Sequence, residues 1–288
     1  MALPAPFFSE SAGQLYNYDC VDGMLSLPES ICDGLFTSPP YGVGKEYESE
    51  QSFGQYLKLL ADFTRAAYHC IKPGGYMIIN YADYYMFDGV NTKIQPMTYL
   101  YHIIAERVGW NHYCDRIWQK DYASLTDPYT IAHLLPKLEY EHISTFIKPG
   151  SDKKEIVREQ TLHPRAIWST VGIKQAKSTL KDHTAAFPEA LVQMALKVHA
   201  DPGQLWVEPF CGSGTTPYVC KKMGIKYVAF ELSSKHAETS KKRLQQMVMD
   251  FDGTLGEEKQ STIDEVLQDQ YIENGNKPSV KIEMPEDF

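Results

Sequence analysis

The chain has 288 residues with 43% hydrophobic and 23% charged residues, which is ordinary for a soluble globular protein, and a net charge of −9. No apolar run approaches the roughly 20 residues of a membrane span, and the N-terminus lacks the basic start and long apolar run of a signal peptide. Six scattered cysteines without a Cys-x-x-Cys pair argue against a zinc site or disulfide framework and favour a reducing, cytosolic compartment.

The negative charge is concentrated at the C-terminus. Residues 250–288 hold eleven acidic residues and three lysines, so this tail carries −8 and the rest of the chain about −1. Residues 148–183 reverse the balance, with eight basic and four acidic residues. A local positive excess is compatible with a surface that contacts phosphates, but solvated loops are often lysine-rich as well.

Strands and helices are predicted to alternate along the chain. Short apolar runs predict buried strands at residues 34–37, 76–80, 114–118, 142–147, 204–208 and 226–231. Helical periodicity is found at residues 53–71, 95–108, 187–199 and 217–223. This alternation predicts an α/β fold with a mostly parallel twisted sheet and helices on both faces. Two stretches, 121–138 and 149–183, interrupt it and are interpreted as insertions.

A rigid turn, Ser-Pro-Pro-Tyr, follows the first predicted strand at residues 38–41. Its two prolines remove backbone donors and fix φ, which leaves a stiff main chain rich in acceptors. Acceptors on both hydrogens of an aryl amine stabilise the positive charge that develops when its nitrogen attacks a methyl group. Tyr41 offers a flat face for a base turned out of a duplex. A proline turn that only closes a strand is the simpler alternative.

A glycine loop, Gly-Ser-Gly at residues 212–214, stands between a predicted strand and a predicted helix. Glycines let the backbone approach a ligand, and N–H groups at a helix start favour a carboxylate or phosphate. Glu231 ends the next strand about 20 residues later, where an acid can accept hydrogen bonds from ribose hydroxyls. The loop lacks the Gly-Lys-Ser/Thr of a P-loop and the third glycine of a dinucleotide loop, so an adenosyl amino acid fits best. A purely structural turn is the alternative.

Together these motifs resemble the exocyclic-amino DNA methyltransferases of the permuted β group, over most of residues 13–248. The matching segments are YNYDC (16–20), TSPPY (37–41), CIKPGG (70–75), RIWQK (116–120), HTAAFP (183–188) and EPFCGSGT (208–215). The proline turn precedes the glycine loop, which is the order of the permuted group. Two departures are a glutamate instead of aspartate at 208 and a tighter arginine-to-tryptophan spacing in RIWQK.

The resemblance implies a Rossmann-like S-adenosylmethionine-dependent methyltransferase fold with circularly permuted motif order. It implies S-adenosyl-L-methionine as cofactor, double-stranded DNA as partner and no metal. The implied catalytic residues are Ser38, Pro39, Pro40 and Tyr41. The implied cofactor-binding residues are Asp19, Cys20, Glu208, Pro209, Phe210, Gly212, Ser213, Gly214, Thr215 and Glu231. A homodimer and a cognate restriction endonuclease are left open.

Target recognition is expected from the two insertions that flank the catalytic face. The candidate DNA contacts are Lys120, His163, Arg165, Lys174, Lys177 and Lys181. Tyr81, Tyr84 and Tyr85 either line the pocket of the target base or pack at a strand end. The expected organisation is a catalytic half (1–148), a target-recognition insertion (149–183), a cofactor-binding half of the same domain (184–249) and an acidic tail (250–288).

The prediction of the target base depends on the residue before Pro-Pro. In this family, serine there is typical of cytosine-N4 enzymes, whereas adenine-N6 enzymes usually carry Asp or Asn. We therefore predict site-specific methylation of N4 of a flipped-out cytosine, in the cytoplasm of a bacterium or archaeon or encoded by a phage. Adenine N6 is the first alternative. A catalytically silent DNA-binding subunit and an RNA or protein amino-methyltransferase are the others.

Overall fold

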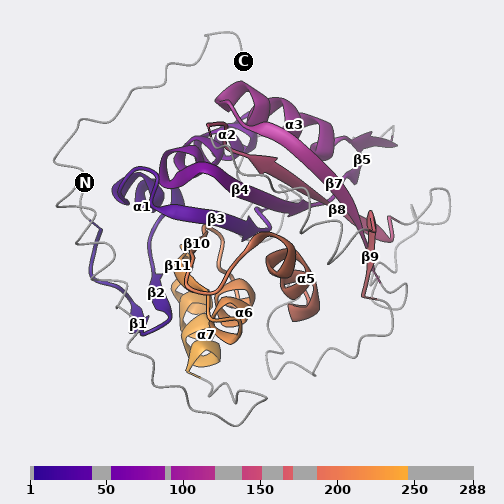
Figure 1. Cartoon of the computed structure of the whole chain (residues 1–288). Helices are drawn as coiled ribbons and strands as arrows, with labels where there is room; N and C mark the ends of the chain where they lie inside the picture. The colour runs from indigo at the N-terminus through magenta and orange to yellow at the C-terminus, as the bar shows by residue number, and fades with distance from the viewer. Residues whose placement is uncertain are drawn as a thin grey trace.

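The computed structural model describes residues 3–40, 53–87, 92–120, 138–150, 165–170 and 187–245. Nine strands form one sheet: β1 (Phe8–Glu10), β2 (Gly13–Tyr16), β3 (Cys32–Thr37), β4 (Ile71–Tyr81), β7 (Asn111–Gln119), β8 (Tyr140–Ile147), β9 (Ile167–Ser169), β10 (Leu205–Glu208) and β11 (Lys226–Phe230). Their order across the sheet is β1-β2-β11-β10-β3-β4-β8-β7-β9 (Figure 1). A separate antiparallel pair is formed by β5 (Tyr84–Phe87) and β6 (Thr92–Gln95).

The centre of the sheet is parallel. Strands β2, β11, β10, β3 and β4 run in one direction, so their carboxyl ends meet at one edge. Strands β1 and β8 are antiparallel to their neighbours, and β9 pairs parallel with β7. The prediction of a mostly parallel sheet is confirmed.

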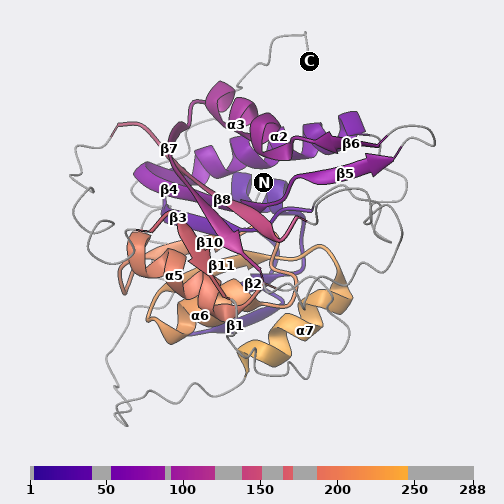
Figure 2. The same cartoon turned by 90° about the vertical axis from the view of Figure 1, so that its right-hand side faces the viewer.

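Helices cover both faces of the sheet, as the alternation predicts (Figures 1 and 2). One face carries α1 (Cys20–Ser26), α2 (Phe53–Cys70) and α3 (Met97–Val108), and its core includes Leu35, Phe63 and Tyr101. The other carries α5 (Glu189–His199), α6 (Thr215–Lys222) and α7 (Ser234–Leu244), and its core includes Phe36, Trp206 and Leu196. Successive side chains of a strand point to opposite faces, so Leu35 and Phe36 serve different cores.

Element boundaries differ from prediction mainly at the start of β4. The sequence predicts a helix to residue 71 and a strand from residue 76, with Lys-Pro-Gly-Gly between them, yet the strand already begins at Ile71, which pairs with Cys32. The register then shifts between Cys32 and Gly34, and β4 and β3 pack very closely. A Cβ atom on Gly75 would lie 2.7 Å from the carbonyl oxygen of Asp33, so only glycine fits there. The glycine therefore serves strand packing.

Lys148 does not belong to an exposed basic surface, although it begins the basic stretch of the sequence. Its side chain is buried, and its ammonium donates to the carbonyls of Tyr68 (2.6 Å) and Ile71 (2.8 Å). Burial lowers the pKa of Lys148. The residue ties β8 to the end of α2.

None of the described helices is long and apolar enough to cross a membrane. All six cysteines are free thiols, and all but Cys114 are buried.

Candidate active site

The middle of the sheet contains a topological switch point. From β10 the chain passes through α6 to β11 on one side, and from β3 it passes through α2 to β4 on the other side. Because α6 and α2 cover opposite faces, the connections after these neighbouring parallel strands diverge. Open α/β sheets bind ligands outside the carboxyl ends of strands at such a point.

The proline turn and the glycine loop meet at this switch point. In the parallel register Val207 lies opposite Leu35, so Ser38 and Phe210 leave the sheet at the same edge. The Thr37 hydroxyl, directly before the turn, donates a hydrogen bond to Oε1 of Glu208, directly before the loop. The structure therefore brings together two segments about 170 positions apart in the sequence.

Glu208 is a buried acid, with a relative exposure of 2%. The Phe210 N–H donates to its Oε1 at 3.0 Å, so this oxygen receives two neutral donors. Burial raises the pKa of Glu208 to about 7, against the effect of these hydrogen bonds. A carboxylate in such surroundings would be stabilised by a cation brought in by a ligand.

The two glycines of the glycine loop differ in their surroundings: Gly212 borders open space, and Gly214 packs against α7. Gly212 (φ 53°) and Gly214 (φ 79°) both lie in the left-handed region that favours glycine. Among the described residues, a Cβ on Gly212 would have only the Phe210 carbonyl oxygen within 4 Å, at 3.9 Å. A Cβ on Gly214 would lie 3.1 Å from Oγ of Ser240 in α7. A ligand therefore has room beside Gly212, whereas Gly214 permits helix packing.

Glu231 lies beside this loop, as its spacing predicts. Its Oε2 accepts from the Gly212 N–H at 2.7 Å, and its Oε1 accepts from the Ser233 N–H at 2.8 Å. Burial raises the pKa of Glu231. Asn17 at the end of β2 donates to the carbonyls of Glu231 (2.8 Å) and Leu232 (3.0 Å) and so holds this corner in place.

Asp19 and Cys20 lie at the same edge, because β2 is parallel to β11 and ends beside it. Oδ1 of Asp19 accepts from the N–H groups of Val21 (2.8 Å) and Asp22 (3.1 Å), so Asp19 is the N-cap of α1. Cys20 is buried, and burial raises the pKa of its thiol. The structure thus gives Asp19 a capping role that the family resemblance does not indicate.

The remaining predicted loop residues follow the same edge. Pro209 and Phe210 lead into the glycine loop, and Phe210 packs edge-on against Phe63 with a centroid distance of 5.2 Å. Ser213 and Thr215 are both buried, and Thr215 is the first residue of α6.

The proline turn is held by α2. The Tyr56 hydroxyl donates to the carbonyl oxygen of Pro40 at 2.7 Å. A small pocket beside the turn is lined by Pro39, Tyr56, Leu60, Tyr81, Met97 and Tyr101. Tyr81 therefore reaches the wall where a target base is expected. Tyr84 packs against the core and Tyr85 lies in β5, while Tyr41 lies outside the described residues.

Few of the candidate DNA contacts fall in the described part of the chain. Lys120, at the end of β7, forms an ion pair with Glu141 at 2.8 Å, and Glu141 also accepts from Asn80 at 2.7 Å. Arg165 is exposed beside β9. The other candidates, His163, Lys174, Lys177 and Lys181, lie outside the described residues.

Four residues of the site are not among the predicted site residues: Thr37, Tyr56, Asn17 and Glu141. Thr37 and Asn17 lie inside the matching segments TSPPY and YNYDC, but the sequence assigns them no role. Each contacts a predicted residue through its side chain. Thr37 and Tyr56 sit in patterns that also describe ordinary core positions. Only the partners that folding brings near distinguish them.

Comparison with known proteins identifies the family. Residues 32–242, which include both motifs, match the DNA methylase family of N6 and N4 enzymes. This chain belongs to the N6/N4 DNA methylase family. The methylase is similar to Type II methyltransferase M.HpaI of Haemophilus parainfluenzae, with 23% identity over 89% of this chain and 82% of that one. It is also similar to DNA adenine methyltransferase YhdJ of Escherichia coli (strain K12), with 22% identity over 82% of this chain and 84% of that one.

Solved structures share the fold of the methylase. PvuII DNA methyltransferase (cytosine-N4-specific) matches 94% of this chain and 96% of its own, with a TM-score of 0.69 and 21% identity. The DNA modification methylase TTHA0409 of Thermus thermophilus, complexed with S-adenosyl-L-methionine, matches 80% of this chain and 93% of its own, with a TM-score of 0.62 and 22% identity. The α/β architecture is thus that of S-adenosylmethionine-dependent methyltransferases.

Proposed function

We propose that this methylase transfers a methyl group from S-adenosyl-L-methionine to N4 of a flipped-out cytosine in a specific sequence of duplex DNA, as a member of the permuted β group. The observation that carries the proposal is the junction of the Ser38 turn with the Gly212 loop at the switch point of the sheet. A methyl acceptor held by the first segment would face a cofactor held by the second.

The residues present fit S-adenosyl-L-methionine, the cofactor of this enzyme class. Open space beside Gly212 admits a ligand close to the backbone. Glu208 is buried among neutral donors, and a methionine ammonium group would supply the missing cation. Glu231 has its carboxylate at the end of β11, in the position suited to ribose hydroxyls. When bound, the cofactor supplies an electrophilic methyl group on a sulfonium.

The proline turn would hold the acceptor. Ser38 and the carbonyl of Pro39 are proposed to accept the two hydrogens of the base amine, which would raise the electron density on its nitrogen. The hydrogen bond from Tyr56 to Pro40 fixes the turn, so these acceptors need little reorganisation as charge develops. Tyr41 is proposed to stack on the base.

Cytosine N4 is favoured over adenine N6 by Ser38. The PvuII enzyme, whose fold matches nearly the whole chain, is cytosine-N4-specific. YhdJ, an adenine methyltransferase, is similar in sequence, so adenine N6 is the second candidate. Both bases present an exocyclic amine, and the proline turn would serve either.

Target recognition is proposed to lie in 121–138 and 149–183. The exposed Arg165 would contact phosphates together with Lys174, Lys177, Lys181 and His163. Lys120 would join them only if DNA displaced it from Glu141. The relatives named Type II methyltransferases support a cognate restriction endonuclease as partner, and a homodimer remains part of the proposal.

Mass spectrometry of nucleosides tests the proposal directly. The purified chain is incubated with S-adenosyl-L-methionine and duplex DNA, and the DNA is digested and searched for N4-methylcytosine and N6-methyladenine. N4-methylcytosine is the expected product. Detection of N6-methyladenine alone would mean that adenine, and not cytosine, is the target base. Cofactor binding without transfer to any DNA would instead favour a silent DNA-binding subunit. Preferential labelling of RNA over duplex DNA would identify a different substrate class.

A further inference from the structure

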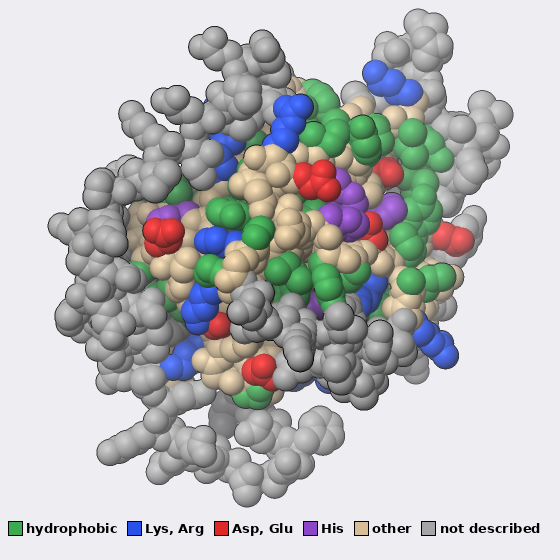
Figure 3. Space-filling model, turned by 45° about the horizontal axis from the view of Figure 1, so that its top comes forward, with side chains coloured by type: hydrophobic (Ala, Val, Ile, Leu, Met, Phe, Trp, Pro, Cys, Tyr) green, Lys and Arg blue, Asp and Glu red, His purple; other side chains and the backbone are tan. Residues whose placement is uncertain are grey.

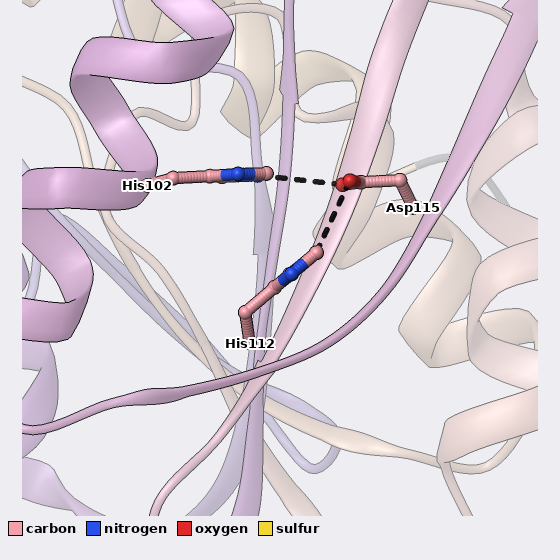
Figure 4. A group of neighbouring side chains, drawn as sticks. All are labelled: His102, His112 and Asp115. Carbon is pink, nitrogen blue, oxygen red and sulfur yellow. Dashed lines mark ion pairs between the residues drawn. The ribbon is translucent and has the colours of Figure 1, made fainter.

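A cluster of histidine and aspartate side chains lies on the face that carries α3. Figure 3 shows histidine side chains gathered beside acidic ones on one face of the molecule. His102 comes from α3, and His112 and Asp115 come from β7 (Figure 4). Both histidines point their ring nitrogens toward the same carboxylate. Neither Ser38 nor the glycine loop is part of this cluster.

A β-bulge places His112 and Asp115 on one face of the sheet. Residues three apart in a regular strand point to opposite faces. Here the register shifts between His112 and Cys114, so His112 lies opposite Phe146 and Asp115 lies opposite Ser144. Those two partners are two positions apart on β8 and share a face. Bulges re-aim side chains in this way, and His102 on α3 completes the set from above the sheet.

The distances suit a metal ion. Nε2 of His102 lies 3.4 Å from Oδ1 of Asp115, and Nε2 of His112 lies 3.1 Å from Oδ2. The ligand atoms of all three residues lie within 4.8 Å of one another. A tetrahedral ion with bonds of about 2.0–2.1 Å places its ligand atoms about 3.3 Å apart. Two neutral imidazoles and one carboxylate also match the charge and softness that zinc-like ions prefer.

We propose that His102, His112 and Asp115 form a binding site for a divalent transition-metal ion of the zinc type, with water completing its coordination. The ion would link α3 to strand β7. None of the proposed ligands is a cysteine, so the spacing of the cysteines in the sequence does not indicate this site.

The site adjoins the wall of the pocket beside Pro39. Ser144 contacts Asp115 through its hydroxyl, lies 3.0 Å from Nε2 of His102, and lies 2.8 Å from the hydroxyl of Tyr81. Tyr81 lines that pocket. Metal binding would therefore restrain the Tyr81 side chain through its hydrogen bond with Ser144. The proposal concerns binding itself and stands whether or not the chain methylates cytosine.

Calorimetric titration of the chelator-treated full chain with Zn²⁺ tests the site. One Zn²⁺ per chain is expected at this cluster, together with a higher thermal unfolding midpoint. His112→Phe keeps an aromatic ring against Phe146 but removes the nitrogen ligand, and Asp115→Asn removes the charge. Each should weaken Zn²⁺ binding at least about tenfold and abolish the thermal stabilisation.

His69→Gln is the matched control, because His69 contacts the carbonyl of Leu27 outside the cluster and glutamine can keep that bond. It should bind Zn²⁺ as the wild type does. Substitution with Co²⁺ should give visible absorption without a thiolate charge-transfer band, because the neighbouring Cys114 is not a ligand in the proposal. Equal affinity of wild type and both cluster variants, absence of binding, or a thiolate spectrum would each overturn the assignment.

Discussion

The buried acid Glu208 should make the stability of the methylase depend on pH in an unusual direction. Its pKa is raised from an ordinary 4.5 to about 7 by burial, so the native state holds a proton that the unfolded chain releases. The stabilising contribution is complete below pH 4.5 and is lost as pH rises through 7. Integrated over the shift, it is about 3 kcal/mol. Between pH 5 and pH 8 most of this contribution, about 2–3 kcal/mol, is lost.

Glu208→Gln isolates this contribution. The hydrogen bonds from Thr37 and Phe210 both end on Oε1, and the oxygen of a glutamine amide can accept them in the same way. The variant therefore resembles the protonated acid at every pH. Urea unfolding of the cofactor-free chain, followed by circular dichroism from pH 5 to pH 8, gives the two free energies of unfolding.

Relative to Glu208→Gln, the wild type should lose about 2–3 kcal/mol of unfolding free energy over this range. Titrating groups that do not interact with Glu208 affect both proteins and cancel in the difference, whereas the coupling between Glu208 and Glu231 is part of the measured effect. Glu106→Gln, at an exposed position of α3, is the control and should run parallel to the wild type. Parallel curves for the wild type and Glu208→Gln would refute the reasoning, since they would mean that Glu208 is ionised at no cost in the folded chain.

Three further predictions address the two motifs. Ser38→Ala should lower turnover on the order of 100-fold, from loss of one transition-state acceptor, while calorimetry finds cofactor affinity nearly unchanged; wild-type turnover would contradict the role of Ser38. Gly212→Val should abolish cofactor binding because its side chain enters the open space beside the loop. Gly203→Val imposes similar positive-φ strain where no described atom lies within 4 Å of the added Cβ, and this variant should still bind the cofactor. Tyr56→Phe should cost about 1 kcal/mol in urea unfolding and reduce kcat more than cofactor affinity, because the Pro40 carbonyl loses its anchor; unchanged kcat would count against that anchor.

The centre of the sheet could be predicted because strands β3, β4, β10 and β11 are buried on both faces. Runs such as Tyr76–Asn80 and Lys226–Phe230 are continuously apolar or nearly so, and this pattern needs no knowledge of partners. Helix α7 was missed for the opposite reason. Its sequence SKHAETSKKRL is mostly polar, and only Ala237, Ser240 and Leu244 are buried. Packing against the sheet decides its structure, so local periodicity gave little signal. Strands β1, β2 and β9 are three or four residues long and were missed too.

The candidate site could be predicted only where the backbone itself carries the signal. Proline and glycine restrict or free φ wherever they occur, so the two loops stand out in the sequence. Thr37 is different, since its hydroxyl matters only because folding brings Glu208 beside it. Asp19 shows the reverse case, because its family resemblance pointed to a cofactor contact while its side chain caps α1.

The charge of the loop also argues for the class of cofactor. Glu208 and Glu231 both lie at the carboxyl edge, and burial raises the pKa of each, with Glu231 adding to the effect on Glu208. A pyrophosphate would bring two further negative charges toward these buried acids, in surroundings where charge is poorly screened. An adenosyl amino acid instead brings an ammonium and a sulfonium against one carboxylate, so its charge is net positive. Electrostatics therefore favours the same ligand that the missing third glycine favours, although the two arguments share no residue. That agreement is the physical reason to regard the Gly212 loop as a methyl-donor site rather than a dinucleotide site.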